Sequence, residues 1–319
     1  MSTVGNVAVA AVEVALAVAV QGGMLLQVGL SYAFLRFQWR NRPMPYAVPG
    51  VDELGPESLL TVVIPAYRER ASIEQTLRRL SLAAERPDLI EVIVVDAGGG
   101  DGTMELAAEV AKDVVGGKRG LRAVRCDVAS TGGRGPAVAA GCRAAVGDIL
   151  MVVHADTAVP LAYDARCRAA LADPFALATA FRFGVERESI LAEAPGAPVL
   201  NLLRAIPFRI MEATVHVRST LLQLPFGDQA FGGLDDPLAS VPILEDFLLV
   251  QRLRRLGATG AGRIVILGSS PALCSARRWR KSSVWRVNLT NQAVMLLHTY
   301  AGYTPHDIFE LYYGAKVAP

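Results

Sequence analysis

Short runs of apolar residues alternate with segments of helical period between residues 59 and 153. Parallel strands that are covered on both faces read as continuous apolar runs, and the amphipathic segments between them predict crossover helices. The expected strands are Leu59 to Ile64, Leu89 to Val95, Leu121 to Cys126 and Ile149 to Val153, and the expected helices are Ser72 to Ala84, Thr103 to Lys112 and Pro136 to Ala145. This alternation predicts βαβ units and therefore an α/β fold with a doubly wound, mostly parallel central sheet and helices on both faces.

Beyond Asp156 the regular alternation ends, and longer apolar runs and helical segments follow in a mixed order. It contains an apolar run from Phe175 to Val185, a helical stretch around Val199 to Met211 and a strong helix from Leu244 to Leu256. We expect this half to add mixed strands and the second side of a binding site. The apolar helical segment from Val284 to Tyr303 either packs on its own domain, as most such helices do, or lies on an anionic membrane.

The beginning of the chain carries a long apolar run. No charged residue occurs from Val14 to Leu35, a length that can cross a bilayer as a helix. Arg36, Arg40 and Arg42 follow, so the positive-inside tendency places the rest of the chain in the cytosol. The alternative is a soluble helix packed on a partner. The expected organisation is a single-pass membrane-anchor helix in residues 1–42, a proline-containing connector in 43–58 and one catalytic domain in 59–319.

Composition excludes several classes of function. Hydrophobic residues make up 52% of the chain and the formal net charge is +2, without a broad basic face, so nucleic acid is not an expected partner. The cysteines are widely spaced and form no CxxC pair, which argues against a zinc site and a disulfide framework. They are Cys126, Cys142, Cys167 and Cys274.

Two aspartates close apolar runs of the expected sheet. Asp96 and Asp156 each stand where a buried parallel strand delivers a carboxylate to the carboxyl edge, which is where open α/β folds bind ligands. Asp96 has an alternative role as the cap of a helix that begins near Gly102, but Asp101 is better placed for capping. The two positions indicate an enzyme.

Six motifs occur in a fixed order from Thr61 onward. They are Thr61 to Glu69, Val94 to Thr103, His154 to Thr157, Gly227 to Gln229, Glu245 with Asp246, and Arg277 to Trp279. Together they resemble the family 2 glycosyltransferases with the GT-A fold, and most strongly the group named for its association with radical-SAM and selenium-domain genes. Several ordered motifs are far more specific than any one alone.

The resemblance implies transfer of a sugar from a nucleotide-sugar donor to an acceptor hydroxyl, with inversion at the anomeric carbon and with a divalent metal, Mn²⁺ or Mg²⁺. It implies that Asp156 is a metal ligand, because a carboxylate-bound cation can neutralise the leaving diphosphate. Asp246 is implied as the general base. The alternative for Glu245 and Asp246 is that two acids in a first helical turn complement the helix dipole. His154 either contacts the metal or donor or is a structural residue at a strand end.

The resemblance also divides the remaining site residues between donor and acceptor. The donor-binding residues it implies are Pro65, Tyr67, Glu69, Asp96, Arg134 and His154, and the acceptor-binding residues are Asp228, Gln229, Glu245, Arg278 and Trp279. The segment Gly227 to Gln229 could equally be a surface turn. The acceptor is unknown, and a lipid-linked acceptor is one option. Ser275 stands where processive relatives have glutamine, so polymer synthesis is not expected.

Two other classes of function remain open. The glycine-rich segment Val94 to Gly102 also resembles the first motif of SAM-dependent methyltransferases, with Asp127 as the following acid. In those folds the motif ends the first strand, whereas a complete strand and helix precede it here. The other class is a non-catalytic nucleotide-sugar-binding membrane protein, because Ala139 and Ser275 depart from the family pattern.

Overall fold

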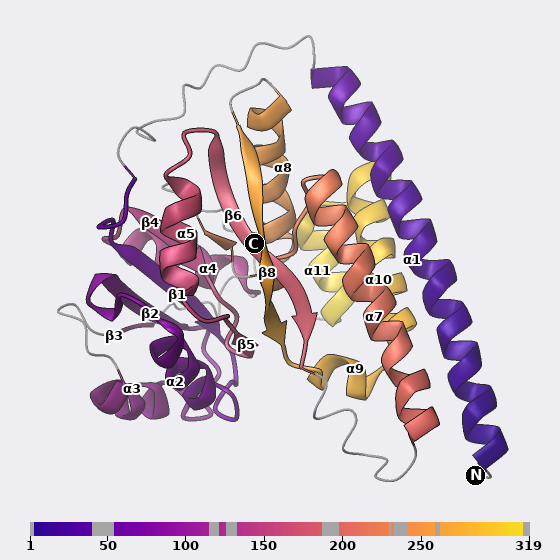
Figure 1. Ribbon diagram of the computed structural model, residues 1–319, viewed down its shortest axis with the longest axis horizontal. Helices are drawn as coiled ribbons and strands as arrows, with labels where there is room; N and C mark the ends of the chain where they lie inside the picture. Colours follow the sequence, from indigo (N-terminus) through magenta and orange to yellow (C-terminus); the bar gives the residue numbers. More distant parts are fainter. Residues whose placement is uncertain are drawn as a thin grey trace.

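The structure is a computed structural model that describes residues 3–39, 54–114, 121–125, 133–186, 198–229, 231–232, 241–258 and 262–314. Strands in these segments form an 8-stranded sheet in the order β3-β2-β1-β4-β7-β6-β8-β5 (Figure 1). The strands are β1 Leu60–Ala66, β2 Ile90–Asp96, β3 Leu121–Arg125, β4 Ile149–Val152, β5 Thr157–Ala158, β6 Ala176–Val185, β7 Phe231–Gly232 and β8 Arg263–Cys274.

The first half of the chain forms the parallel part of this sheet. Strand β1 lies between β2 and β4 and is parallel to both, and Leu60 is in register with Ile90 and Ile149. Alternate residues of β1 face opposite layers: Leu60 packs in the core under α2, α3 and α5, whereas Val63 packs against α4. These helices are α2 Ile73–Ala83, α3 Thr103–Val114, α4 Gly135–Ala144 and α5 Tyr163–Leu171. The expected doubly wound sheet is confirmed.

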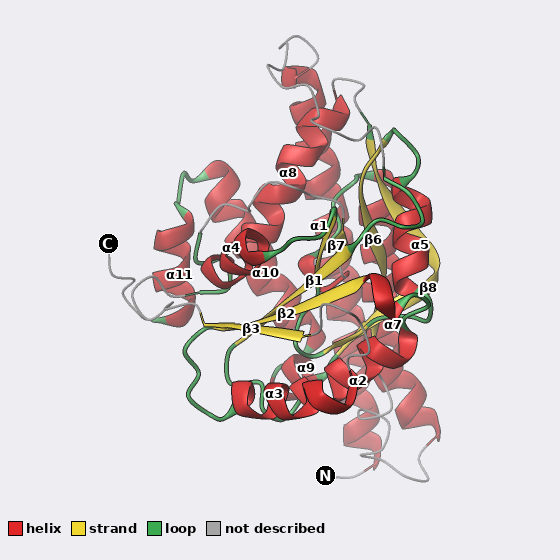
Figure 2. Ribbon diagram, turned by 90° about the vertical axis from the view of Figure 1, so that its left-hand side faces the viewer, coloured by secondary structure: helices red, strands yellow, loops and turns green. Residues whose placement is uncertain are grey.

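The second half adds mixed strands, as expected. Strand β7 is antiparallel to β4 and β6, while β6 is parallel to β8. Helix α8 spans Glu245–Ala258, and helix α7 spans Pro198–Leu221, continuing past Pro207 and well beyond the expected end near Met211. Met211 and Val215 pack in a core with Phe183, and this tertiary packing keeps the later turns of α7 helical. Figure 2 shows the yellow strands with red helices around them.

Helix α1, Thr3–Trp39, packs along α7 and α10, the latter spanning Val284–Tyr300 (Figure 1). Its inner face buries Ala17, Gln21 and Met24. Residues on its outer side are apolar and exposed, among them Val12 and Leu26 at 58% and 67% exposure. The window from Val9 to Leu26 has a mean hydropathy of 2.0 over 18 residues, so this helix is long and apolar enough to cross a membrane.

Several expectations concern residues outside the described segments. Most of the connector, residues 43–53, lies there, as do Arg40, Arg42, Cys126 and Asp127.

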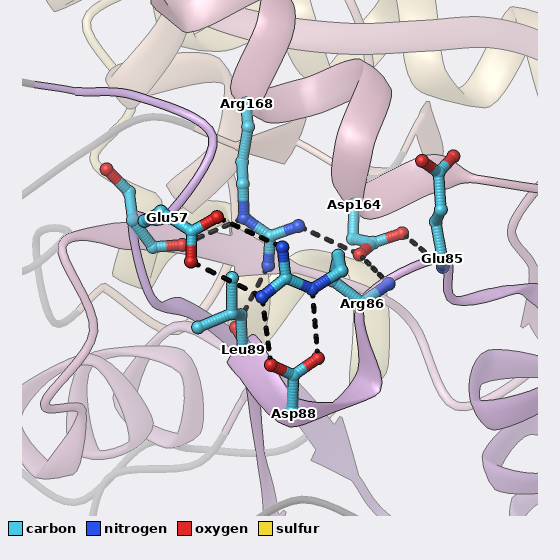
Figure 3. Close-up of polar contacts among 8 residues, drawn as sticks. Glu57, Glu85, Arg86, Asp88, Leu89, Asp164 and Arg168 are labelled. Atoms are coloured by element: carbon cyan, nitrogen blue, oxygen red, sulfur yellow. Dashed lines mark hydrogen bonds and ion pairs between the residues drawn. The ribbon is translucent and has the colours of Figure 1, made fainter.

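A buried ion pair joins the sheet to its neighbouring loops (Figure 3). Arg168 on α5 donates to Asp164 at 2.8 Å and also to the backbone carbonyls of Ser58 and Leu89. Asp164 accepts from the backbone N–H groups of Glu85 and Arg86, each at 2.9 Å. Both side chains are almost completely buried, so the pair fastens the residues before β1 and β2 and those after α2 to one helix.

Candidate active site

The carboxyl ends of three neighbouring strands meet at one edge of the sheet. Asp96 is the last residue of β2 and is in register with Ala66 at the end of β1, while β4 on the other side of β1 leads into His154 and Asp156. The structure therefore brings Asp96 and Asp156 to the same edge, on opposite sides of β1. This is the place at which open α/β sheets bind ligands.

Asp96 fixes the glycine loop that follows β2. Its Oδ1 accepts from the backbone N–H groups of Gly98 and Gly99, at 3.0 and 3.2 Å. Capping of α3 falls to Asp101 as expected, because its Oδ1 accepts from the backbone N–H of Thr103. Hydrogen bonds, chiefly from the Thr103 side chain, hold the pKa of Asp101 below its usual value. Asp96 and residues 100–105 line a small pocket at this edge of the sheet.

Glu69 and Asp156 are joined by one arginine. Arg277 donates to both carboxylate oxygens of Glu69, at 3.0 and 2.8 Å, and to Oδ2 of Asp156 at 3.3 Å. Ser72 also donates to Glu69 at 2.6 Å. Arg277 begins α9, Arg277–Lys281, so segments that follow β1, β4 and β8 meet here.

Arg134 and Glu245 form an ion pair between the start of α4 and the start of α8. Two glycines make this possible. An added Cβ on Gly133 would lie 2.0 Å from the carbonyl oxygen of Pro242, and one on Gly135 would lie 1.9 Å from that of Val241. The glycine-arginine-glycine sequence therefore allows its backbone to lie directly against the loop before α8. Glu245 is buried, and its Oε2 receives no hydrogen bond from the described residues.

Asp246 lies beside Glu245 and is held by backbone groups. Its Oδ2 accepts from the N–H of Gly227 at 2.9 Å, and its Oδ1 accepts from its own helix at Phe247. A buried arginine of α7, Arg218, is a nearby cation and stacks on the Phe226 ring. Burial lowers the pKa of Arg218 to about 9, the Asp246 carboxylate opposes this shift, and Arg218 stays protonated at neutral pH. Asp246 thus has a fixed orientation and a neighbouring positive charge.

Two of the expected acceptor residues, one buried and one partly buried, are engaged in contacts within the protein. Gln229 is fully buried, accepts from Ser219 and Phe226, and donates to the carbonyl of Phe181. Trp279 makes edge-to-face contacts with Phe183 and Phe208, at centroid distances of 6.3 and 6.0 Å. These contacts explain Gln229 as an anchor of its loop and Trp279 as a packing residue.

The remaining expected site residues lie at the surface or near the ends of strands. Arg278 donates to Asn291 and to the Tyr312 hydroxyl on α11, Pro305–Tyr313, which places this helix beside α9. Tyr67 is 55% exposed, and Pro65 is buried within β1. The backbone carbonyl of His154 accepts from Thr157. Asp228 belongs to the short 3-10 turn Gly227–Gln229, but its side chain is not among the parts of the structure that are described.

The acidic residues present fit a divalent metal that is shared with a substrate. Within the described segments no group of three or more His, Cys, Asp or Glu side chains forms a protein-only metal site. Mg²⁺ and similar cations are commonly bound by one or two carboxylates together with substrate phosphates. Asp156 at the sheet edge, with His154 two residues before it, suits that kind of incomplete site.

Two residues were missed by the sequence interpretation. Arg277 belongs to the same motif as Arg278 and Trp279, but the sequence alone indicates no separate role for it. Arg218 lies in the last turn of the long helix α7, and no local pattern distinguishes it from the other arginines of that helix.

The parallel sheet with its acidic edge, extended by mixed strands, defines the class of fold as GT-A-like α/β. The model of the family Glycosyl transferase family 2 matches residues 61–209, and this part of the chain is a glycosyl transferase family 2 domain. The match supports glycosyltransferases over methyltransferases, in agreement with the strand that precedes the glycine-rich motif.

Individual relatives are more distant. An undecaprenyl-phosphate 4-deoxy-4-formamido-L-arabinose transferase from Aeromonas hydrophila subsp. hydrophila is 33% identical over 103 residues, which is 32% of this chain and 30% of the relative. The match therefore spans less than a third of that relative's length. Among solved structures, the mannosyltransferase PcManGT from Pyrobaculum calidifontis, in complex with GDP-Man and Mn²⁺, is 19% identical with a TM-score of 0.48, covering 94% of this chain and 81% of that chain. Glucosyl-3-phosphoglycerate synthase from Mycobacterium tuberculosis, in complex with Mn²⁺, UDP and glucosyl-3-phosphoglycerate, is 20% identical with a TM-score of 0.47, covering 79% and 84%.

Proposed function

We propose that this protein is a metal-dependent, inverting glycosyltransferase that moves a sugar from a nucleotide-sugar donor to an acceptor hydroxyl. The observation that carries the proposal is the pair of aspartates, Asp96 and Asp156, on either side of β1 at the carboxyl edge of a family 2 domain. The same motifs support the narrower assignment to the group associated with radical-SAM and selenium-domain genes.

The donor lies along this edge. Both backbone hydrogen bonds of Asp96 use Oδ1, which leaves Oδ2 to accept from the base or the ribose hydroxyls. Pro65 and Tyr67 stand on either side of Ala66, which is in register with Asp96, so the end of β1 lies beside the donor at this edge. Asp156 would hold the metal, with His154 two residues before it contacting the metal or the donor, and a Mn²⁺ or Mg²⁺ ion bound there would supply positive charge for the leaving diphosphate.

Asp246 removes the proton of the acceptor. The acceptor oxygen attacks the anomeric carbon from the face opposite the diphosphate, a new C–O bond forms, and the electron pair of the broken bond leaves with the diphosphate. The hydroxyl proton passes to the Asp246 carboxylate. Its hydrogen bond from Gly227 fixes the direction of the carboxylate, and that orientation favours transfer from a correctly placed hydroxyl.

The acceptor site lies on the side of α8 and α11. Glu245 has a buried carboxylate oxygen that receives no hydrogen bond from the described residues and is available to an acceptor hydroxyl. Arg134 holds Glu245 in place, and Arg278 with Tyr312 borders the same side.

Attachment of α1 to the membrane through its apolar outer side, with the domain in the cytosol, completes the proposal; the inner side of α1 stays packed on α7 and α10. The outer side of α1 is apolar and suits lipid, and the Aeromonas relative is named for undecaprenyl phosphate, a lipid acceptor. A lipid-linked acceptor would therefore meet the enzyme at the membrane. Carbonate extraction of membranes tests this: retention of the full chain in the pellet supports the anchor, and release into the supernatant contradicts it.

Ligand binding by the full chain in detergent tests the enzymatic proposal. A ligand that binds the native state raises its apparent stability, by about 2.7 kcal/mol at one hundred times its Kd. We expect one nucleoside diphosphate to raise Tm only with Mn²⁺ or Mg²⁺, and Asp156→Ala to abolish the metal-dependent part. Arg78→Gln, on the exposed face of α2, is the matched control. Stabilisation by SAM without metal would instead favour a methyltransferase.

A further inference from the structure

Arg277 occupies the position between the two carboxylates that border the proposed donor site. Its guanidinium is bidentate on Glu69 and also contacts Asp156, as given above. The arginine side chain is 41% exposed, whereas that of Glu69 is 17% exposed. The cation is therefore anchored on its inner side and accessible on its outer side.

The backbone fastens Arg277 to the Asp156 loop. Strands β5 and β8 pair so that Thr157 is opposite Cys274, and the N–H of Ser275 donates to the carbonyl of Asp156 at 3.1 Å. The Ser275 side chain then accepts from the N–H of Arg277 at 3.2 Å. Any ligand that approaches Asp156 from this edge consequently meets the guanidinium as well.

Charge explains why an arginine stands here. Two carboxylates near one another repel, and a guanidinium between them removes that repulsion while the site holds no other cation. The hydrogen bond to Glu69 is the main reason that the pKa of Arg277 lies above its usual value; burial opposes this shift, so the group stays positive. A divalent cation on Asp156 would repel this arginine and displace it from that carboxylate.

We propose that Arg277 is a further donor-binding residue, which holds Glu69 and Asp156 together before a metal binds and turns to the diphosphate of the donor when a metal binds Asp156. The proposal rests on the proposed function. The guanidinium fork matches phosphate oxygens in two parallel hydrogen bonds, which a lysine ammonium cannot reproduce. Glu69 keeps the arginine at the site during the exchange, because its two hydrogen bonds do not involve Asp156.

Two binding measurements test Arg277→Gln, and the substitution should raise the affinity in one of them and lower it in the other. Mn²⁺ alone, measured by the electron paramagnetic resonance of the unbound ion, should bind the variant roughly 3- to 10-fold more tightly, because a competing cation has been removed. UDP or GDP in the presence of Mn²⁺ should bind roughly 10- to 100-fold more weakly, because charge-assisted hydrogen bonds are lost. The matched monophosphates, UMP and GMP, lack the outer phosphate, so their affinity should fall less in the variant than that of the diphosphates.

Two further variants separate this role from a structural one. Arg277→Lys keeps the positive charge, so Mn²⁺ affinity should stay at the parent value while diphosphate affinity falls. Arg78→Gln should change neither affinity. Circular dichroism and Tm identify any variant that has lost its fold.

These binding results distinguish failure of the role proposed for Arg277 from failure of the proposed glycosyltransferase function. Equal loss of monophosphate and diphosphate affinity in folded Arg277→Gln, or unchanged Mn²⁺ affinity, overturns the role of Arg277 and leaves the proposed function standing. A parent protein that binds neither Mn²⁺ nor UDP nor GDP overturns both.

Discussion

The buried pair of Arg168 and Asp164 has a matched exposed counterpart in the same protein. In both, an acid is followed four residues later by an arginine on a helix: Asp164 and Arg168 on α5, and Glu74 and Arg78 on α2. The side chains of the first pair are 2% exposed or less, whereas those of the second are 46% and 47% exposed. Replacing each arginine by methionine therefore makes the same chemical change in two environments.

The expected difference in stability is large. An exposed pair of this spacing contributes about 0.3–0.5 kcal/mol, so Arg78→Met should have almost no effect. Arg168→Met leaves the Asp164 carboxylate buried without its cation and removes the donors to Ser58 and Leu89. Removing one partner of a buried pair costs about 3–5 kcal/mol. At roughly 2–4 °C per kcal/mol, Tm should fall by about 6–20 °C.

Thermal unfolding of the full chain in detergent, followed by far-ultraviolet circular dichroism, measures both variants. If Arg168→Met lowers Tm by no more than Arg78→Met does, the buried pair does not hold these loops and the reasoning from burial is refuted.

The acid dependence of stability gives a second check on the same pair. Burial alone would raise the pKa of Asp164, but hydrogen bonds from Glu85, Arg168 and Arg86 outweigh it and lower the pKa below the usual value. A carboxyl whose folded pKa is lowered contributes stability above its unfolded pKa of about 3.9, and this contribution is lost as the pH falls through the folded pKa. Asp164→Asn should therefore flatten the loss of stability below about pH 4, and an unchanged acid profile would contradict this account.

Three further predictions concern the site and the first helix. Asp246→Asn should abolish sugar transfer with donor affinity largely kept, and turnover at the parent rate would show that another group is the base. Gly135→Ala should lower the free energy of unfolding by about 1–3 kcal/mol and also lower turnover, because a Cβ 1.9 Å from the Val241 carbonyl oxygen pushes α4 away from α8. A Tm equal to that of the parent would contradict the close contact. Deleting residues 1–39 should lower Tm and promote aggregation, measured by light scattering, because α1 no longer covers α7 and α10 and Met24 no longer packs against Leu249 and its neighbours on α8. A monodisperse, equally stable fragment would show that α1 is not part of the folded unit.

The sequence by itself determined the parallel half of the sheet and the place of its acidic edge. Continuous apolar runs that end in Asp96 and Asp156 specify buried parallel strands, and the carboxyl ends of parallel strands lie at one edge whatever the rest of the chain does. The expected boundaries of β1, β2, α2 and α4 differ from the observed ones by only a residue or two. The spacing of apolar residues follows the repeat of the local helix or strand, so it can be recognised without knowledge of the rest of the fold.

Only the tertiary structure decided which polar side chains meet. Arg277 reaches Glu69 across 208 positions of the chain and Asp156 across 121, and no local pattern distinguishes it from Arg278. Gln229 occupies a motif position that suggested contact with a ligand, yet its amide is used entirely inside the protein. Periodicity specifies which face a residue occupies, whereas its partners and burial depend on how distant segments pack, and that is set by the whole chain.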